Sequence, residues 1–312
     1  MSAATDAAEV VRTSEPARLH LFRRMRELWG YREILTNLTR RELKVKYTSS
    51  VLGAAWSMLN PLLYLAVFSL VFTVVLPNGV PYFAIFLLSG LLAWNFFATS
   101  LGQASQSVVG NGNLVKKVYF PREILPLASM GAAFVDLLLQ SMILVGFIVL
   151  MQVLGDFTQP YAANLLLLPL SIVALLVFTA ALSLWVAALN VRYRDTQHLL
   201  SLALLAWFWL TPIVFPPGYM QEKLIDLANG HAYLWHLYLL NPMATIVFGF
   251  QRAIYGTVDP LATTDSGAHV LVDASVGWHA AMLGIVILGS VVLLYGFWRT
   301  FFRLSGDFAE EL

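Results

Sequence analysis

The sequence predicts an all-α integral membrane protein with six transmembrane helices. The chain is 59% hydrophobic and only 12% charged, whereas a soluble domain devotes about a quarter of its residues to charge. Residues 47–115 contain no Asp, Glu, Lys, Arg or His. Apolar stretches of bilayer-spanning length, about 20 residues, recur along the chain. A chain with this composition cannot cover its surface in water, so we expect it to lie in a membrane.

Six apolar segments are long enough to cross a bilayer as helices. They are residues 51–76, 82–108, 124–153, 162–189, 197–215 and 277–298. Turns rich in Pro and Gly separate some neighbours, for example at 77–81 and 155–164. The expected division is a cytoplasmic tail at 1–30, an interfacial helix at 31–48, a transmembrane domain at 49–304 and a second cytoplasmic tail at 305–312.

The distribution of basic residues predicts the orientation. If the N-terminus is cytoplasmic and six helices cross, all 19 Lys and Arg residues except Lys223 and Arg252 fall on the cytoplasmic side. Both termini are then cytoplasmic, in a multi-pass membrane protein.

Residues 216–276 leave an ambiguity. Residues 233–256 are apolar enough for a seventh span, but Asn241 and Pro242 interrupt them. The positive-inside rule hardly separates six spans from seven. We predict a re-entrant pair of short helices that dip into the outer leaflet.

The arm before the first span predicts an amphipathic helix at 31–48. Tyr31, Ile34, Leu35 and Leu38 recur at helical spacing, with charged residues between and after them. A basic amphipathic helix beside a membrane lies in the interface plane. The basic residues proposed for this role are Arg40, Arg41, Lys44 and Lys46. A plain positive-inside anchor remains the alternative.

Several kinds of chemistry are excluded. The chain has no cysteine, which removes disulfides and thiolate sites. It has no phosphate-binding loop, zinc-binding His-Glu-x-x-His helix or Gly-x-Ser-x-Gly nucleophile motif. We therefore expect no enzyme activity, cofactor or metal in this chain, and no nucleic-acid partner. No internal repeat supports an inverted-repeat secondary transporter.

Asp136 is the one carboxylate inside a predicted span, and Gln140 and Ser129 share its helical face. This polar stripe could face a transport pathway, and it is the sole support for a proton-coupled carrier. Alternatively, Asp136 is a buried carboxylate that hydrogen-bonds to a neighbouring helix.

Aromatic residues cluster on two spans. Trp94 and Phe97 lie on the second span, and Trp207 and Trp209 lie near the outer half of the fifth. They fit either an interfacial aromatic belt or a surface on which sugar rings stack along an export pathway.

The loop between the second and third spans is short and basic. An Asn can cap a short helix there, and Pro121 ends it. We predict about two turns, with Leu114, Val115 and Val118 on one side and a basic rim. Such a surface suits docking into a groove of a soluble partner, although an ordinary positive-inside loop fits too. The segment comprises Asn113, Leu114, Val115, Lys116, Lys117, Val118, Tyr119, Phe120 and Pro121.

Several stretches together match a known family. They are RRELKVKYTSSVLGAAWSMLNPL (40–62), NLVKKVYFPREILPLAS (113–129), LNVRYRDTQHLL (189–200), LTPIVFPPGYM (210–220) and LNPMATIVFGFQRAIYG (240–256). The chain resembles the membrane subunits of type-2 ABC exporters, specifically the branch that exports polysaccharides and polyol phosphates such as O-antigen, teichoic acid and capsule.

The resemblance implies a homodimer in which each subunit binds a separate cytoplasmic ATPase, and ATP and Mg are held by that ATPase. Residues 113–121 match the family's coupling helix, and 217–256 match its re-entrant outer helices. Trp94, Phe97, Trp207 and Trp209 become candidates for the translocation path, together with Asp136. The implied cargo is a lipid-linked glycan. A drug or small-lipid exporter of the same fold is the alternative, and the proton-coupled carrier is the alternative from another class.

Overall fold

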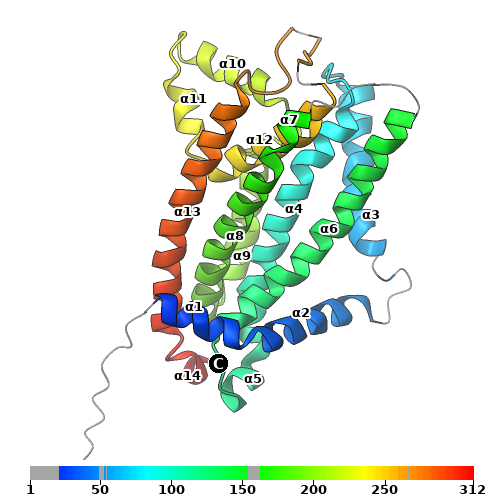
Figure 1. Cartoon of the computed structure of the whole chain (residues 1–312). Helices are drawn as coiled ribbons and strands as arrows, with labels where there is room; N and C mark the ends of the chain where they lie inside the picture. Colours follow the sequence, from blue (N-terminus) through cyan, green and yellow to red (C-terminus); the bar gives the residue numbers. More distant parts are fainter. Residues whose placement is uncertain (1–20, 49–52, 54, 154–161, 260, 266) are drawn as a thin grey trace, which may run out of the picture.

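A computed structural model describes residues 21–48, 53, 55–153, 162–259, 261–265 and 267–312. These residues form an elongated helical bundle, which confirms the all-α class (Figure 1). Most of the predicted N-terminal tail, the first residues of the first predicted span and most of the turn at 155–164 lie outside the described residues.

Among the described residues, five helices are long and apolar enough to cross a membrane. They are α3 with its π-helical extension (Ala55–Val75), α4 (Phe83–Ser107), α6 (Ile124–Val153), α7 with α8 (Ala163–Arg192) and α13 (Val276–Leu304). Each corresponds to a predicted span. Uninterrupted apolar sequence predicts such helices well, because the backbone must satisfy its own hydrogen bonds in lipid.

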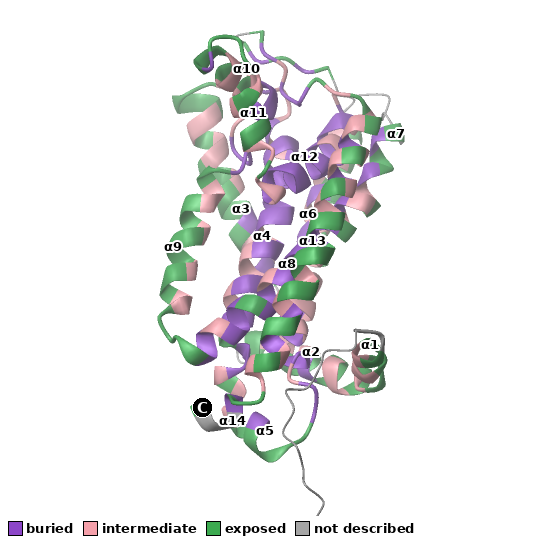
Figure 2. Cartoon of the chain, turned by 90° about the vertical axis from the view of Figure 1, so that its left-hand side faces the viewer, coloured by how far each residue is buried: buried purple, intermediate pink, exposed green. Residues whose placement is uncertain are grey.

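The predicted span at 197–215 is not a full-length helix, so five helices rather than six are long and apolar enough to cross a membrane in the described part of the chain. Here α9 (Thr196–Trp209) has 14 residues, about 21 Å of helix, against about 30 Å of hydrocarbon. The helix ends ahead of Pro212, since proline disfavours helical geometry in the preceding residue. Even so, α9 runs from the lower end of the bundle toward the layer of α10 and α11 (Figure 2).

The segment after α9 is non-helical but buried. Thr211, Ile213 and Val214 are almost fully covered. The side chain of Gln251 donates a hydrogen bond of 2.8 Å from Nε2 to the carbonyl oxygen of Pro212. Irregular backbone is tolerated at membrane depth where protein surrounds it, so the short α9 and this segment together connect the two ends of the bundle.

The upper layer contains α10 (Pro217–Leu227), α11 (Tyr233–Tyr238) and α12 (Pro242–Ile254). Residues 233–256 are therefore broken at Asn241, as predicted, and do not form one continuous crossing. The Asn241 side chain caps α12 by accepting hydrogen bonds from the backbone N–H groups of Met243 and Ala244. Packing of α12 against α4, α8 and α13 makes it part of the core.

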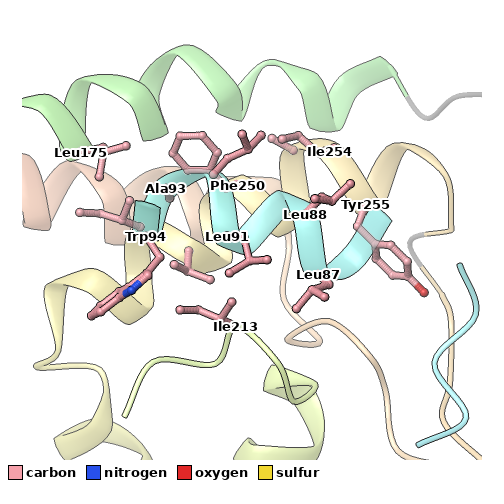
Figure 3. Close-up of a cluster of buried hydrophobic side chains, with 14 of the residues drawn as sticks. Leu87, Leu88, Leu91, Ala93, Trp94, Leu175, Ile213, Phe250, Ile254 and Tyr255 are labelled. Carbon is pink, nitrogen blue, oxygen red and sulfur yellow. The ribbon is translucent and has the colours of Figure 1, made fainter. Parts of the chain in front are cut away.

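The core is centred on α4, where 78% of the residues in an 18-residue apolar stretch are buried. Leu87, Leu88 and Leu91 of α4 lie among side chains of α12 and α8, including Phe250 and Leu175 (Figure 3). By contrast, α9 contains no buried residue. The bundle thus has a tightly packed centre and a loosely covered side.

Two helices cross the lower end of the bundle, α1 (Leu21–Gly30) and α2 (Arg32–Tyr47) (Figure 1). The predicted helix at 31–48 corresponds to α2. Its apolar residues pack on the cluster formed by α6, α8 and α13, with Leu38 buried, so this face covers protein. The helix α1 was not predicted, because residues 21–30 are short and rich in arginine.

Candidate functional site

The lower end of the bundle presents the segment predicted to dock on a partner. Its helix, α5 (Gly112–Lys117), is shorter than predicted, and Val118 is already extended with φ −126° and ψ 133°. The prediction that the helix continues to Pro121 is therefore wrong. The physical reason is that Phe120 is buried and precedes a proline, which favours extended backbone ahead of the turn into α6.

The apolar face of this segment is also corrected. Val115 is buried, and Leu114 packs against the same cluster instead of forming an exposed apolar surface. Val118 and Tyr119 are instead exposed, by 49% and 87% of their surfaces. The accessible surface consists of Asn113, Lys116, Lys117, Val118 and Tyr119, while Phe120 and Pro121 face inward.

The segment is fixed to α1 by a buried ion pair directly after it. The Arg24 guanidinium donates from Nε and Nη2 to the two carboxylate oxygens of Glu123, each at 2.8 Å. Trp298 Nε1 of α13 donates to the same carboxylate at 3.1 Å. Burial lowers the pKa of Arg24, but the bonds and charges of Glu123 and Glu27 more than reverse this, and the pKa lies above its usual value.

A second attachment comes from α2. Arg41 donates a hydrogen bond to the side-chain oxygen of Asn111, at the start of α5. The Asn111 amide nitrogen donates in turn to the carbonyl oxygen of Ser107, at 2.8 Å. Arg40 and Lys44, two more of the proposed basic residues on α2, are exposed. The arm therefore contacts the chain on both sides of residues 113–121: Arg41 bonds just before this segment, and Arg24 bonds just after it.

Asp136 does not face an open cavity. Its carboxylate is buried and lies 2.6 Å from Lys46 Nζ of α2. Gln140, one turn along α6, accepts a hydrogen bond of 3.3 Å from Asn95 of α4. The structure agrees with the interpretation of Asp136 as a carboxylate held by a neighbouring helix.

The four aromatic candidates separate into two groups. Trp94 and Phe97 are almost fully buried in the core and do not line a surface in this conformation. Trp207 is half-buried, and its Nε1 donates a hydrogen bond of 2.8 Å to the Asn241 side chain. Trp209 is 54% exposed. Only the pair on α9 is accessible.

A cavity of about 530 Å³ lies between α9 and α11. Its lining is mainly apolar and includes Trp207 and Tyr238, with Asn241 between them. Neither Tyr238 nor Asn241 was predicted as a site residue, because the sequence does not show which helix meets α9. An apolar cavity with aromatic walls and few polar groups suits an amphipathic ligand. Within the described parts of the chain, no three His, Asp or Glu side chains gather to hold a metal ion.

Asn241 connects this cavity to the fold, and its replacement is informative. The side chain caps α12, accepts from Trp207 and donates from Nδ2 to the Leu210 carbonyl oxygen at 3.1 Å. We expect Asn241→Ala to lower the free energy of unfolding in detergent by about 2–3 kcal/mol, since a cap is lost and a Trp N–H is left unpaired. Asn113→Ala, at an exposed position, should change it little. Equal effects of the two changes would contradict this role.

Among the described residues, the five helices long and apolar enough to cross a membrane are typical of a multi-pass membrane protein. The chain belongs to the family of ABC-2 type transporters, which matches residues 34–255. It is a multi-pass membrane protein and the permease component, which lacks an ATPase and acts with an ATPase subunit.

Curated relatives carry a more specific name. The chain is 32% identical over 293 residues to the O-antigen export system permease protein RfbA of Myxococcus xanthus, covering 94% of this chain and 100% of the relative. Two proteins of Klebsiella pneumoniae with the same name are each 28% identical, over 220 and 219 residues, covering 70% of this chain and 79% of each relative.

Proposed function

We propose that this chain is the membrane subunit of an ATP-driven exporter that moves a lipid-linked polysaccharide, or a related cell-envelope glycan, across the bacterial cytoplasmic membrane. The observation that carries the proposal is the relationship to an O-antigen export permease over that relative's entire length. This full-length match favours glycan cargo over drugs or small lipids.

The proposed cycle begins at the lower end of the bundle. ATP and Mg bind to a pair of partner ATPases, whose closure moves the segment at residues 113–121 and the arm attached to it. The exposed Lys116, Lys117, Val118 and Tyr119 form the contact with the ATPase. Both termini are cytoplasmic in this arrangement, and α9 with residues 210–216 completes a sixth crossing. The helices α11 and α12 then form the re-entrant pair in the outer leaflet.

The proposed assembly is a homodimer in which a second copy covers the sparsely packed side. Support comes from α3, where Ser57 and Pro61 are the buried residues, and from α9, which has none. Apolar side chains exposed on these helices include Leu63, Val67 and Leu202. The glycan passes along this side, where Trp207, Trp209 and Tyr238 offer ring faces for weak stacking, and weak contacts allow a polymer to be released at each step.

Depletion of the chain tests the proposed cargo. We expect a lipid-linked glycan to accumulate on the cytoplasmic side, because export and not synthesis is blocked, and lipid-linked oligosaccharide profiling would detect it. Re-expression of the wild-type chain should remove the intermediate. Sensitivity to a drug without any accumulated glycolipid would contradict the proposal and favour the small-molecule alternative.

A further inference from the structure

Asp136 is the centre of a polar cluster that joins three helices. Lys46 Nζ lies 2.6 Å from Oδ2 of Asp136. The hydroxyl groups of Tyr47 and Ser57 lie 2.6 and 2.9 Å from Oδ1, and 2.6 Å from each other. Lys46 and Tyr47 end α2, Ser57 lies in the first turn of α3, and Asp136 belongs to α6. These four residues are called the Asp136 cluster.

The cluster satisfies its own polar groups. Each carboxylate oxygen faces a donor, and the two hydroxyl groups also contact one another. Burial, followed by the hydrogen bond to Asp136, raises the pKa of Tyr47 to about 12, so this hydroxyl keeps its proton and can donate. Complete polar networks in a low-dielectric setting are rigid, and a missing member leaves the others without partners. The Asp136 cluster is therefore expected to hold its three helices in a fixed arrangement.

The helix that depends most on this cluster is α3. Its buried residues are Ser57 and Pro61. Only 6% of the residues in an 18-residue apolar stretch of α3 and its extension are buried. Farther along, α3 makes a ring contact from Phe68 to Phe208 of α9, with centroids 6.3 Å apart. A ring contact tolerates sliding more readily than a charged cluster with fixed geometry. The polar attachment of α3 thus lies at the end nearest α2 (Figure 1).

We infer that the Asp136 cluster is the mechanical link through which the arm and α6 move the lower end of α3. Asp136 and Lys46 are then positioning residues of the transport cycle and not residues of the glycan path. The inference rests on the proposed function, because the motion is the one that ATP drives. It predicts that breaking the cluster separates ATP hydrolysis from export while leaving the partner ATPase active.

The first test is Asp136→Asn in the complete complex with its ATPase, reconstituted in proteoliposomes. We expect ATP hydrolysis to persist and the glycan exported per ATP to fall about ten-fold or more, the size of a typical coupling effect. Ser141→Ala is the matched control on the same helix, because its hydroxyl donates only to the local carbonyl oxygen of Leu137, at 2.7 Å. If Asp136→Asn does not assemble, Lys46→Met, at the more exposed end of the pair, makes the same test.

A disulfide can join α2 to α6 without engaging α3, and it separates these two parts of the cluster's role. A Cβ atom added to Gly131 of α6 would lie 3.8 Å from Thr39 Cβ of α2, within the range of about 3.5–4.5 Å seen in disulfides. The chain has no cysteine of its own, so the pair T39C and G131C forms a single defined link. Because α3 stays unlinked, we expect its oxidation to leave export per ATP in Asp136→Asn low. In the otherwise wild-type chain, the oxidised pair should leave export unchanged.

Each outcome decides the inference. Wild-type export per ATP in Asp136→Asn would overturn it, as would loss of export on oxidation in the wild-type background. Restoration of export by the oxidised pair would also overturn it, because a link between α2 and α6 alone would then carry the motion. If the wild-type complex moves no glycolipid, the proposed function fails instead. The cluster is still tested in that case by a spin label at W56C, an exposed position in the first turn of α3, whose mobility should rise in Asp136→Asn. Equal mobility in the two proteins would overturn the inference.

Discussion

Replacing Glu123 by glutamine is expected to destabilise the protein by about 3 kcal/mol or more, because it removes one partner of a buried ion pair. Only 1% of the Glu123 side-chain surface is exposed, against 15% for Arg24. The substitution leaves the guanidinium with only its more exposed partner, Glu27, and weakens the bond from Trp298. Unfolding of the purified protein by SDS in mixed micelles would measure the change.

Glu27 provides a matched control, since it also pairs with Arg24, at 2.7 Å, but is 33% exposed. Glu27→Gln should cost about 1 kcal/mol or less, as exposed ion pairs do. In an Arg24→Met background the cost of Glu123→Gln should fall, because the unpaired charge is gone. Similar costs for the two glutamates, or an undiminished cost without Arg24, would show that this pair does not hold α1 to the bundle.

The parts of the fold that sequence predicts are those governed by local physics. Long apolar runs must be helical in lipid, and five of the six predicted spans are full-length helices. The spacing of Ile34, Leu35 and Leu38 identified the inner face of α2. The Asn241–Pro242 pair marked a break in an apolar segment, and the structure shows its basis, since Asn241 caps α12 and Pro242 lies in its first turn.

The errors arise where distant residues decide the conformation. Residues 210–215 read as the end of a span, yet Pro212 ends α9 early. Hydropathy does not show that Gln251, far along the chain, donates to the Pro212 carbonyl oxygen and so fixes the irregular backbone within the protein. The docking helix ends early because Phe120 is buried in a cluster with residues of α8 and α13. Hydropathy cannot show either contact.

The candidate site follows the same division. The chemistry of residues 113–121 and their place between two spans are evident in the sequence, as is the isolation of Asp136 among apolar neighbours. The partner of Asp136 is not, because Lys46 lies 90 positions away in a different predicted domain. Trp94 and Phe97 looked equivalent to Trp207 and Trp209 for a similar reason, since a helix that is apolar all round does not reveal its buried face.

Changing Val118 and Tyr119 to aspartate is expected to abolish export while leaving the fold intact. Both side chains are exposed, so the free energy of unfolding should change by about 0.5 kcal/mol or less. If they enter the ATPase, an aromatic contact of this kind is worth about 2 kcal/mol or more, which corresponds to about 30-fold weaker association. Binding of the purified ATPase to the permease in detergent would measure this, beside export in cells.

The design separates docking from folding because the chain offers the same change elsewhere. Tyr233→Asp replaces a tyrosine with 60% exposure in the opposite layer, and ATPase binding should be unaffected. Val115→Asp should instead lower the yield of folded protein, since Val115 is 5% exposed and burying an unpaired charge costs free energy of folding. Full ATPase binding by the Val118 and Tyr119 double variant would place the ATPase contact elsewhere on the chain. Lost binding with normal stability would instead show that these two residues, just beyond the end of α5, transmit the motion of the ATPase to the permease.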